Sequence, residues 1–217
     1  MKRVLVTGGT VRLGAVIAEA LRSRGWRVVT SSHRADSDAD VIADLSVPGG
    51  AARLFSEAVE KAEGAFDAIV NNAALFTGDP DALESVNLLA PCALARLLAE
   101  QSGDSPRVVV NMLDTRVLKP GAADDDYSRS KRGLLEATRR LARELAPHVR
   151  VNAVAPGPVL APVDVHEKAG RLLLAGRPRP EDVADAVAYL LEARSTTGAV
   201  VPVDSGQHLV QGGFRQD

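Results

Sequence analysis

The chain has 217 residues, a net charge of −2 at pH 7, and shares of 46% hydrophobic and 25% charged residues. These values are typical of a globular protein with a sizeable core, and they exclude a disordered chain and a fibrous repeat. The balanced charge argues against a nucleic-acid binder, and no apolar run reaches the roughly 18 residues of a membrane span. Because a strand is predicted from Arg3, we expect no signal peptide and a cytoplasmic location.

Apolar runs alternate with helical patterns along the whole chain, which indicates parallel βαβ units in an α/β fold. Strands are predicted over residues 3–7, 27–31, 41–43, 66–71, 107–112, 150–154 and 199–203. Helices are predicted over residues 12–24, 50–63, 81–100, 126–146 and 181–193. We therefore expect a single domain, residues 1–217, built on a doubly wound parallel sheet of seven strands.

The connection between the second and third predicted strands is too short for a helix. Six residues, "ADSDAD", separate Arg34 from Val41, whereas parallel crossovers normally need about a dozen. A loop with the helix missing is predicted here. Further along, the acidic run 124–126 is expected to cap the helix that follows it.

Metal and thiol chemistry receive little support from the sequence. The four histidines show no metal-ligand spacing, so no metal site is predicted. The single cysteine, Cys92, lies in an Ala/Leu-rich helical pattern and is expected to be a small buried apolar group.

A glycine-rich turn, "VTGGTVRLG", follows the first strand. Gly8 and Gly9 would let backbone amides approach a pyrophosphate at a helix N-terminus, although such glycines also occur for steric reasons alone. Arg12 stands where the usual pattern has its middle glycine. The second strand ends without an acid and is followed by His33 and Arg34, which favours NADP over NAD. The alternative is a solvated loop in which these cations face its three aspartates.

A candidate catalytic pair lies in "DDYSRSKRG", where Tyr127 and Lys131 are four residues apart and share one helix face. A lysine cation beside a phenol lowers the pKa of the phenol and makes it usable for proton transfer. The Tyr-x-x-x-Lys pattern is common by chance, but this copy begins the helix after the fifth strand, where it would meet a cofactor.

With these residues in place, the chain resembles the short-chain dehydrogenases/reductases along nearly its whole length. The resemblance rests on "TGGTVRLG", "VNNAA", "ESVNLLAP", the Tyr-Lys pair, "VNAVAPGPV" and "VVPVDSG", in the family's order and spacing. It implies a Rossmann fold with strand order 3-2-1-4-5-6-7 and hydride transfer to or from NADP(H). It also implies proton transfer by Tyr127, a ribose contact and tuning of Tyr127 by Lys131, and a water-linked proton relay through Asn87.

The cofactor-binding residues that the resemblance implies come from every motif of the pattern. They are Gly8, Thr10, Arg12, Leu13, Gly14, His33, Arg34, Asp44, Leu45, Asn72, Ala73, Ala74, Tyr127, Lys131, Pro156, Gly157 and Val159. Asp44 would meet the adenine, and Asn71 would lie on the cofactor path with Asn72.

One position departs from most of the family, because Asp114 stands where a serine usually binds the substrate carbonyl. The pteridine reductases and dihydromonapterin reductases are similar to this chain at that position, at the arginine of the glycine turn and at an aromatic after "NNA", here Phe76. In that subgroup the aspartate helps to protonate a ring nitrogen. The implied substrate-binding residues are Arg12, Phe76, Asp114, Tyr127 and Leu160.

Each of these matches has a simpler explanation. Phe76 would then be a rim aromatic, Asp114 the cap of a turn before Thr115, and Arg12 the partner of a nearby acid. The function predicted is NADPH-dependent reduction of a pterin-like C=N bond. The alternatives are a carbonyl reductase with a drifted Asp114, and a non-catalytic NADP-binding sensor, against which Asn87 with the Tyr-Lys pair argues.

The remaining expectations concern the surroundings of the site. Residues 160–176 are expected to form the substrate lid. The resemblance implies a homo-oligomer, a tetramer or dimer, in which Arg215 of the tail approaches a neighbour's site. A small-molecule substrate is expected, with neither nucleic acid nor membrane as a partner.

Overall fold

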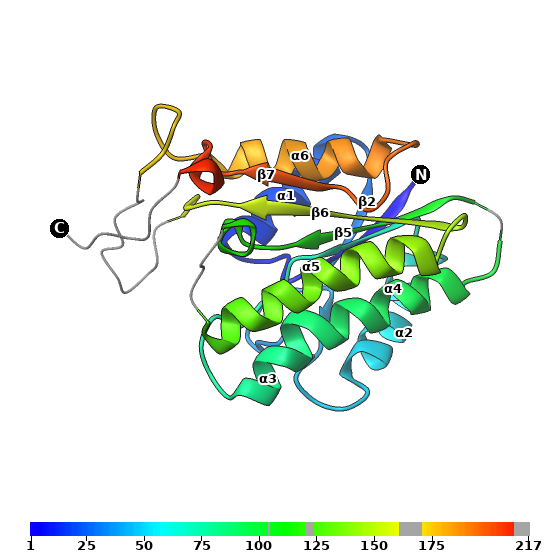
Figure 1. Ribbon diagram of the computed structural model, residues 1–217. Helices are drawn as coiled ribbons and strands as arrows, with labels where there is room; N and C mark the ends of the chain where they lie inside the picture. The colour runs from blue at the N-terminus through cyan, green and yellow to red at the C-terminus, as the bar shows by residue number, and fades with distance from the viewer. Residues whose placement is uncertain (104, 120–123, 161–170, 211–217) are drawn as a thin grey trace.

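Figure 1 shows the computed structural model, which describes residues 1–103, 105–119, 124–160 and 171–210. Seven strands form one parallel sheet in the order β3-β2-β1-β4-β5-β6-β7. They are β1 Arg3–Thr7, β2 Arg27–Ser32, β3 Val41–Ile42, β4 Ala68–Asn71, β5 Arg107–Met112, β6 Val149–Pro156 and β7 Val200–Val203. The predicted Rossmann fold and strand order are therefore confirmed.

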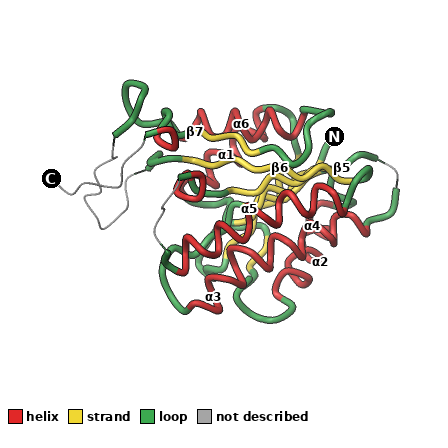
Figure 2. The backbone as a smooth tube through the Cα atoms, viewed as in Figure 1, coloured by secondary structure: helices red, strands yellow, loops and turns green. Residues whose placement is uncertain are grey.

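Helices cover both faces of the sheet (Figures 1 and 2). They are α1 Arg12–Ser23, α2 Gly50–Ala62, α3 Pro80–Glu84, α4 Ala90–Glu100, α5 Asp126–Glu144 and α6 Pro180–Glu192. Helices α1 and α6 pack together on one face, and α2, α4 and α5 lie on the other. Three short segments complete the fold: the π-helix η1 Ser85–Leu89 and the 3₁₀ helices η2 Thr115–Leu118 and η3 Gln207–Leu209.

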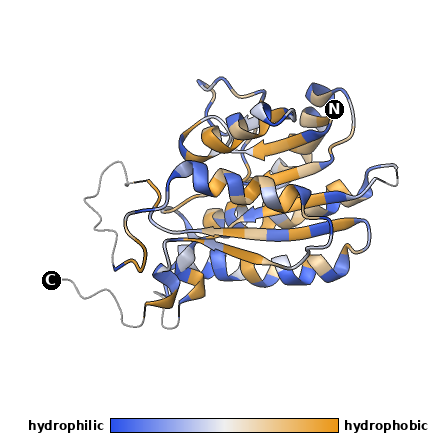
Figure 3. Ribbon diagram, turned by 90° about the horizontal axis from the view of Figure 1, so that it is seen from above, coloured by the Kyte–Doolittle hydropathy of each residue, from blue (hydrophilic) through white to orange (hydrophobic). Residues whose placement is uncertain are grey.

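The core consists of two apolar layers, one on each side of the sheet. Along β1, Leu5 packs toward α2 and α4, whereas Val4 and Val6 belong to the layer under α1 and α6. The strands are accordingly hydrophobic over most of their length, as Figure 3 shows. Each fully buried aliphatic side chain contributes about 1.5–3 kcal/mol, and a slip of one residue would exchange the two faces. The register is thereby fixed, and with it the edge where all strands end.

The loop between β2 and β3 contains no helix, as its length predicted. Asp40 closes it onto the sheet: its Oδ2 accepts hydrogen bonds from the Thr30 N–H at 2.7 Å and from Thr30 Oγ1 at 2.8 Å. Ser31 then pairs with Val41. The short connection leaves the groove beside His33 uncovered by a helix.

The helix predicted over residues 81–100 is interrupted. It begins at Pro80, after Asp79 has capped the first turn, and it widens into the π-helix η1 before continuing as α4. The segment Pro80–Glu100 is also the one helix in the described part of the chain that is long and apolar enough to cross a membrane. Half of that window is buried in the fold, which is how a core helix of a globular protein behaves.

Candidate active site

The glycine-rich turn is held tightly between β1 and α1. Gly8 has a φ of +62°, and a Cβ on Gly14 would lie 2.0 Å from the Gly8 carbonyl oxygen, so glycine is required at both positions. Asn72 fastens the turn, because its Nδ2 donates to the carbonyls of Thr7 and Gly8 at 2.9 and 3.0 Å. The backbone amides at the start of α1 are thereby presented to the groove.

Arg12 has a left-handed backbone, with φ at +51°. This conformation costs an L-residue about 1–2 kcal/mol and costs glycine almost nothing, which explains why glycine is usual here. The side chain is exposed. The exposed side chain is not part of the core, and backbone strain of this kind concentrates at functional sites.

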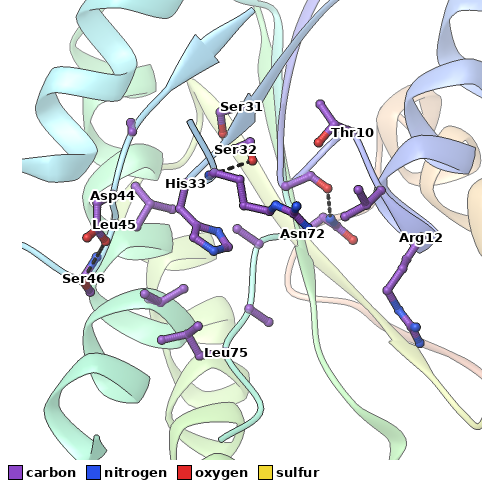
Figure 4. A pocket seen from close by; sticks show the side chains of 18 of the residues that line it. Thr10, Arg12, Ser31, Ser32, His33, Asp44, Leu45, Ser46, Asn72 and Leu75 are labelled. Carbon is purple, nitrogen blue, oxygen red and sulfur yellow. Dashed lines mark hydrogen bonds between the residues drawn. The ribbon is translucent and has the colours of Figure 1, made fainter. Parts of the chain in front are cut away.

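A groove with a volume of about 450 Å³ runs along the carboxyl ends of β1, β2 and β4 (Figure 4). Twelve predicted cofactor residues line it: Gly8, Thr10, Arg12, Leu13, Gly14, His33, Arg34, Asp44, Leu45, Asn72, Ala73 and Ala74. Ser31, Ser32 and Ser46 also line it and were missed. The first two sit at the strand end, where the parallel topology places ligands, so that position was a usable signal.

The basic residues of the groove do not meet at one point. Arg34 makes a bidentate ion pair with Asp36, in which Nε donates to Oδ1 at 3.1 Å and Nη2 donates to Oδ2 at 3.0 Å. Figure 4 shows Arg12 on the opposite side of the groove from Asp44, with its guanidinium directed away from His33. The solvated-loop alternative therefore describes the ion pair that Arg34 makes, although Arg34 also lines the groove at the end of β2.

Asp44 is prepared as an acceptor at the other end of the groove. Its Oδ1 accepts hydrogen bonds from Ser46 Oγ at 2.6 Å and from the Ser46 N–H at 2.8 Å. These bonds, the side-chain one first, lower the pKa of Asp44. The carboxylate therefore stays ionised, and Asp44 lines the groove.

Asp114 and Tyr127 form a hydrogen-bonded pair at the end of β5. Tyr127 Oη donates to Asp114 Oδ2 at 3.0 Å, while Asp114 Oδ1 accepts from the Arg116 N–H at 2.8 Å. Asp114 thus caps η2, as its simpler explanation proposed, and contacts the phenol with its other oxygen. Lys131, one turn along α5, is buried and donates from Nζ to the Met112 carbonyl at 2.8 Å.

The protonation of this pair differs from the sequence expectation. The pKa of Tyr127 is raised well above 10, by burial first and then by the charge and hydrogen bond of Asp114. The expected lowering by Lys131 is wrong here because Lys131 Nζ is directed at Met112, 5.9 Å from the phenol ring centroid, while Asp114 touches the hydroxyl. Burial lowers the pKa of Lys131 to about 8, against the opposing charge of Asp114.

Phe76 lies against the phenol ring of Tyr127. Its ring centroid is 4.7 Å from that of Tyr127, and the ring is 56% exposed. The Arg116 guanidinium carbon also lies 5.1 Å from the Phe76 ring centroid. An exposed aromatic held beside Tyr127 offers a flat apolar surface to a planar ligand.

Asn87 holds the loop that carries Phe76. Its Oδ1 accepts from the Leu75 N–H at 2.9 Å, and its Nδ2 donates to the Leu75 carbonyl at 2.8 Å and to Ser130 Oγ at 3.0 Å. Its side chain is fully buried in the π-helix η1, and π turns are frequent at functional sites. The predicted proton relay through Asn87 stays a prediction.

The cofactor-binding residues predicted at the end of β6 and just after it do not line the groove. Pro156, Gly157 and Val159 are outside the 450 Å³ groove, as are Tyr127 and Lys131. Gly157 is pressed against Asp204, and a Cβ there would lie 2.7 Å from the Asp204 Cβ. Leu160, 36% exposed, is the last described residue before the expected lid. Lid residues 161–170 and Arg215 lie outside the described residues.

Among the described residues, no group of three or more His, Cys, Asp and Glu side chains is arranged to hold a metal ion. Cys92 is buried in α4, where the apolar surroundings raise the pKa of its thiol, as expected of a packing residue.

Comparison with known proteins gives the family. A family model described as Enoyl-(Acyl carrier protein) reductase matches residues 11–208. The chain belongs to the short-chain dehydrogenase/reductase family. A solved structure of FolM alternative dihydrofolate reductase 1 from Brucella canis, complexed with NADP, is 35% identical with a TM-score of 0.88, and the match covers 98% of this chain and 96% of that one.

Curated relatives have differing chemistry. The granaticin polyketide synthase putative ketoacyl reductase 2 of Streptomyces violaceoruber is 33% identical, with 95% of this chain and 96% of the relative covered. Pteridine reductase 1 of Leishmania tarentolae is 29% identical, with the same coverage. Full-length similarity to both leaves the substrate to be argued from the site.

Proposed function

We propose that the chain is an NADPH-dependent reductase of a pterin-like heterocycle with a conjugated C=N bond. The observation that carries this proposal is the hydrogen bond from Tyr127 to Asp114 beside the exposed ring of Phe76. A simple ketone needs a hydroxyl at the position of Asp114, because an ionised carboxylate repels the developing oxyanion. A ring nitrogen that accepts a proton is compatible with a carboxylate nearby.

The groove fits NADP(H). The glycine turn presents amides at the start of α1 for the pyrophosphate, and Asp44 keeps an ionised oxygen for the adenine end. His33 and Arg34 stand at the end of β2, where a 2′-phosphate is recognised. When bound, NADPH supplies the hydride. Lys131 would hold the nicotinamide ribose, and the backbone near Val159 its amide.

The proton that the reduction needs would come from this chain's own residues. Burial and the neighbouring Asp114 keep Tyr127 protonated through neutral pH. This proton would pass to a substrate nitrogen, directly or through water, once the nitrogen replaces Asp114 as the acceptor of the Tyr127 hydrogen bond, which leaves the phenolate to take up a proton from solvent. Phe76 would stack the flat ring of the substrate, and Arg12 would contact it from the glycine turn.

Two relatives support the pterin reading and one supports its rival. The Brucella canis and Leishmania tarentolae proteins are, by name, reductases of dihydrofolate and pteridine. The ketoacyl reductase of Streptomyces violaceoruber favours the alternative, a carbonyl reductase. The homo-oligomer and the cytoplasmic location remain proposals drawn from the family resemblance.

Binding of a 2,4-diaminopteridine antifolate, measured by calorimetry with and without NADPH, tests the proposal. We expect binding at least about tenfold tighter with NADPH, because the nicotinamide completes the stacking surface that Phe76 begins. The same titration with Phe76→Ala should lose most of that gain. Equal and weak binding under both conditions would remove the pterin assignment.

A further inference from the structure

Asp204, immediately after β7, has the most completely bonded carboxylate near the site. It is 3% exposed. Its Oδ2 accepts from Thr115 Oγ1 at 2.5 Å and from the His208 N–H at 2.7 Å, and its Oδ1 accepts from the Gly206 N–H at 3.0 Å. The His208 ring Nδ1 lies 2.9 Å from Oδ2. Burial raises the pKa of Asp204, but the hydrogen bonds from Thr115 and His208 outweigh burial and lower it.

The bonds of Asp204 join parts of the site that are far apart in the sequence. Thr115 belongs to η2, the helix that Asp114 begins. The turn after Asp204 carries the end of the expected lid, since the Ser205 carbonyl accepts from the N–H groups of Leu173 and Leu174 at 2.9 and 3.0 Å. On a third side, Gly157 lies against the Asp204 backbone.

We propose that Asp204 is a positioning residue that acts through Thr115 to aim Asp114 at Tyr127. The inference rests on the proposed roles of Asp114 and Tyr127. Asp114 commits one oxygen to the Arg116 N–H at the start of η2, so the direction of its other oxygen follows the placement of η2.

The hydrogen bond between Thr115 and Asp204 is suited to fixing the position of η2. Thr115 is the next residue after Asp114 and is itself 3% exposed. The hydrogen bond from a hydroxyl to an ionised carboxylate is short and about twice as strong as a hydrogen bond between neutral groups. Both residues of this hydrogen bond are buried, so water cannot replace a lost partner at low cost.

A spectroscopic test reads Tyr127 without any substrate. The chain has two tyrosines, and the other, Tyr189, is 61% exposed on α6. In a Tyr189→Phe background, the tyrosinate absorbance near 295 nm therefore reports Tyr127 alone. We expect the wild-type signal to appear only at high alkaline pH, and to move toward lower pH once Thr115→Val has released Asp114, whose charge and hydrogen bond add to burial in raising the pKa of Tyr127. An unchanged onset in Thr115→Val would overturn the proposal.

The kinetic test separates positioning from packing. Thr115→Val should lower kcat by about tenfold to hundredfold with the KM for NADPH within about twofold, and Thr115→Ser should restore kcat. Thr138→Val is the matched control, because Thr138 is equally buried and hydrogen-bonded but lies three turns along α5. It should lower the melting temperature and leave kcat unchanged. Loss of kcat in both valine variants would show a structural effect and contradict the proposal.

A second variant and the substrate-free titration keep failure of the positioning role distinct from failure of the proposed function. If Thr115→Val fails to fold, Asp204→Asn keeps the shape and removes the charge, and the same earlier tyrosinate onset is expected. If the wild type turns over no pterin, the proposed function fails, but the absorbance titration still decides whether Asp204 positions Asp114. A wild-type onset in Asp204→Asn would contradict the positioning role.

Discussion

Arg12 combines a left-handed backbone with an exposed charge at the mouth of the groove. In Arg12→Gly the backbone strain of about 1–2 kcal/mol disappears, although glycine gives back about 0.5–1 kcal/mol in chain entropy. We expect a gain of up to about 1 kcal/mol in the free energy of unfolding, measured in urea. The KM values for NADPH and pterin should rise about tenfold, since a charge-assisted contact contributes about 1.5–3 kcal/mol. Unchanged KM values would mean that Arg12 binds neither ligand.

Lys131 gives a prediction for stability against pH. Its pKa is about 8 in the folded protein against an ordinary 10.5. Between these values the unfolded chain binds more protons, so the wild type gains stability as pH rises from 8 to 10.5, on the order of 3 kcal/mol. Lys131→Met lacks this term and should be inactive. Its stability advantage over the wild type, greatest below pH 8, should shrink across that range in urea titrations; a constant difference would contradict a buried cation.

The sequence predicted that Tyr127 and Lys131 lie together, but it did not predict their protonation. Tyr127 and Lys131 lie on one helix face, as their spacing required. The direction of the pKa shift depends on which neighbour touches the hydroxyl, and that neighbour, Asp114, comes from another element. Asp204 was missed for a similar reason, because a lone aspartate after a strand gives no sign that it accepts a hydrogen bond from Thr115 in η2.

At the scale of elements, the π-helix η1 and its Asn87 control the Phe76 loop. Asn87→Ala removes the hydrogen bonds to both backbone groups of Leu75 and should cost about 2–3 kcal/mol of stability. It should also speed hydrogen exchange at the Leu75 amide and raise the KM for pterin. Asn152→Ala is the control, because Asn152 is equally buried and bonds to Ala199 and Thr196. The loop role is wrong if Asn87→Ala leaves Leu75 exchange and the pterin KM unchanged, or if Asn152→Ala changes them as much.

Element boundaries follow the same pattern of success and failure. The predicted cap of α5 is confirmed, because Asp125 accepts from the Ser128 N–H at 2.6 Å. Helix α6 begins at Pro180, one residue before the predicted start. The interruption at η1 and the 3₁₀ helices η2 and η3 were missed. An apolar 3.6-residue period continues through a π turn, and a segment of three or four residues has no period to read.

For the whole molecule, alternation of buried strands with amphipathic helices predicted a parallel sheet of seven strands, and the family resemblance supplied the strand order that the structure confirms. The strand order in turn places the ends of β1, β2, β4 and β5 at one edge, which gathers the glycine turn and Asp114. The substrate does not follow from this architecture, because relatives with the same fold reduce ketoacyl or pterin compounds by name.

The rate of NADPH oxidation with a dihydropterin, compared with a simple ketone, tests the central claim most directly. Wild-type kcat/KM should favour the dihydropterin by at least about 100-fold, the usual scale of a positioned acid. Asp114→Ser, which restores the common family residue, should lose most of the pterin rate and none of the ketone rate. Ketone turnover by the wild type without pterin turnover would contradict the account.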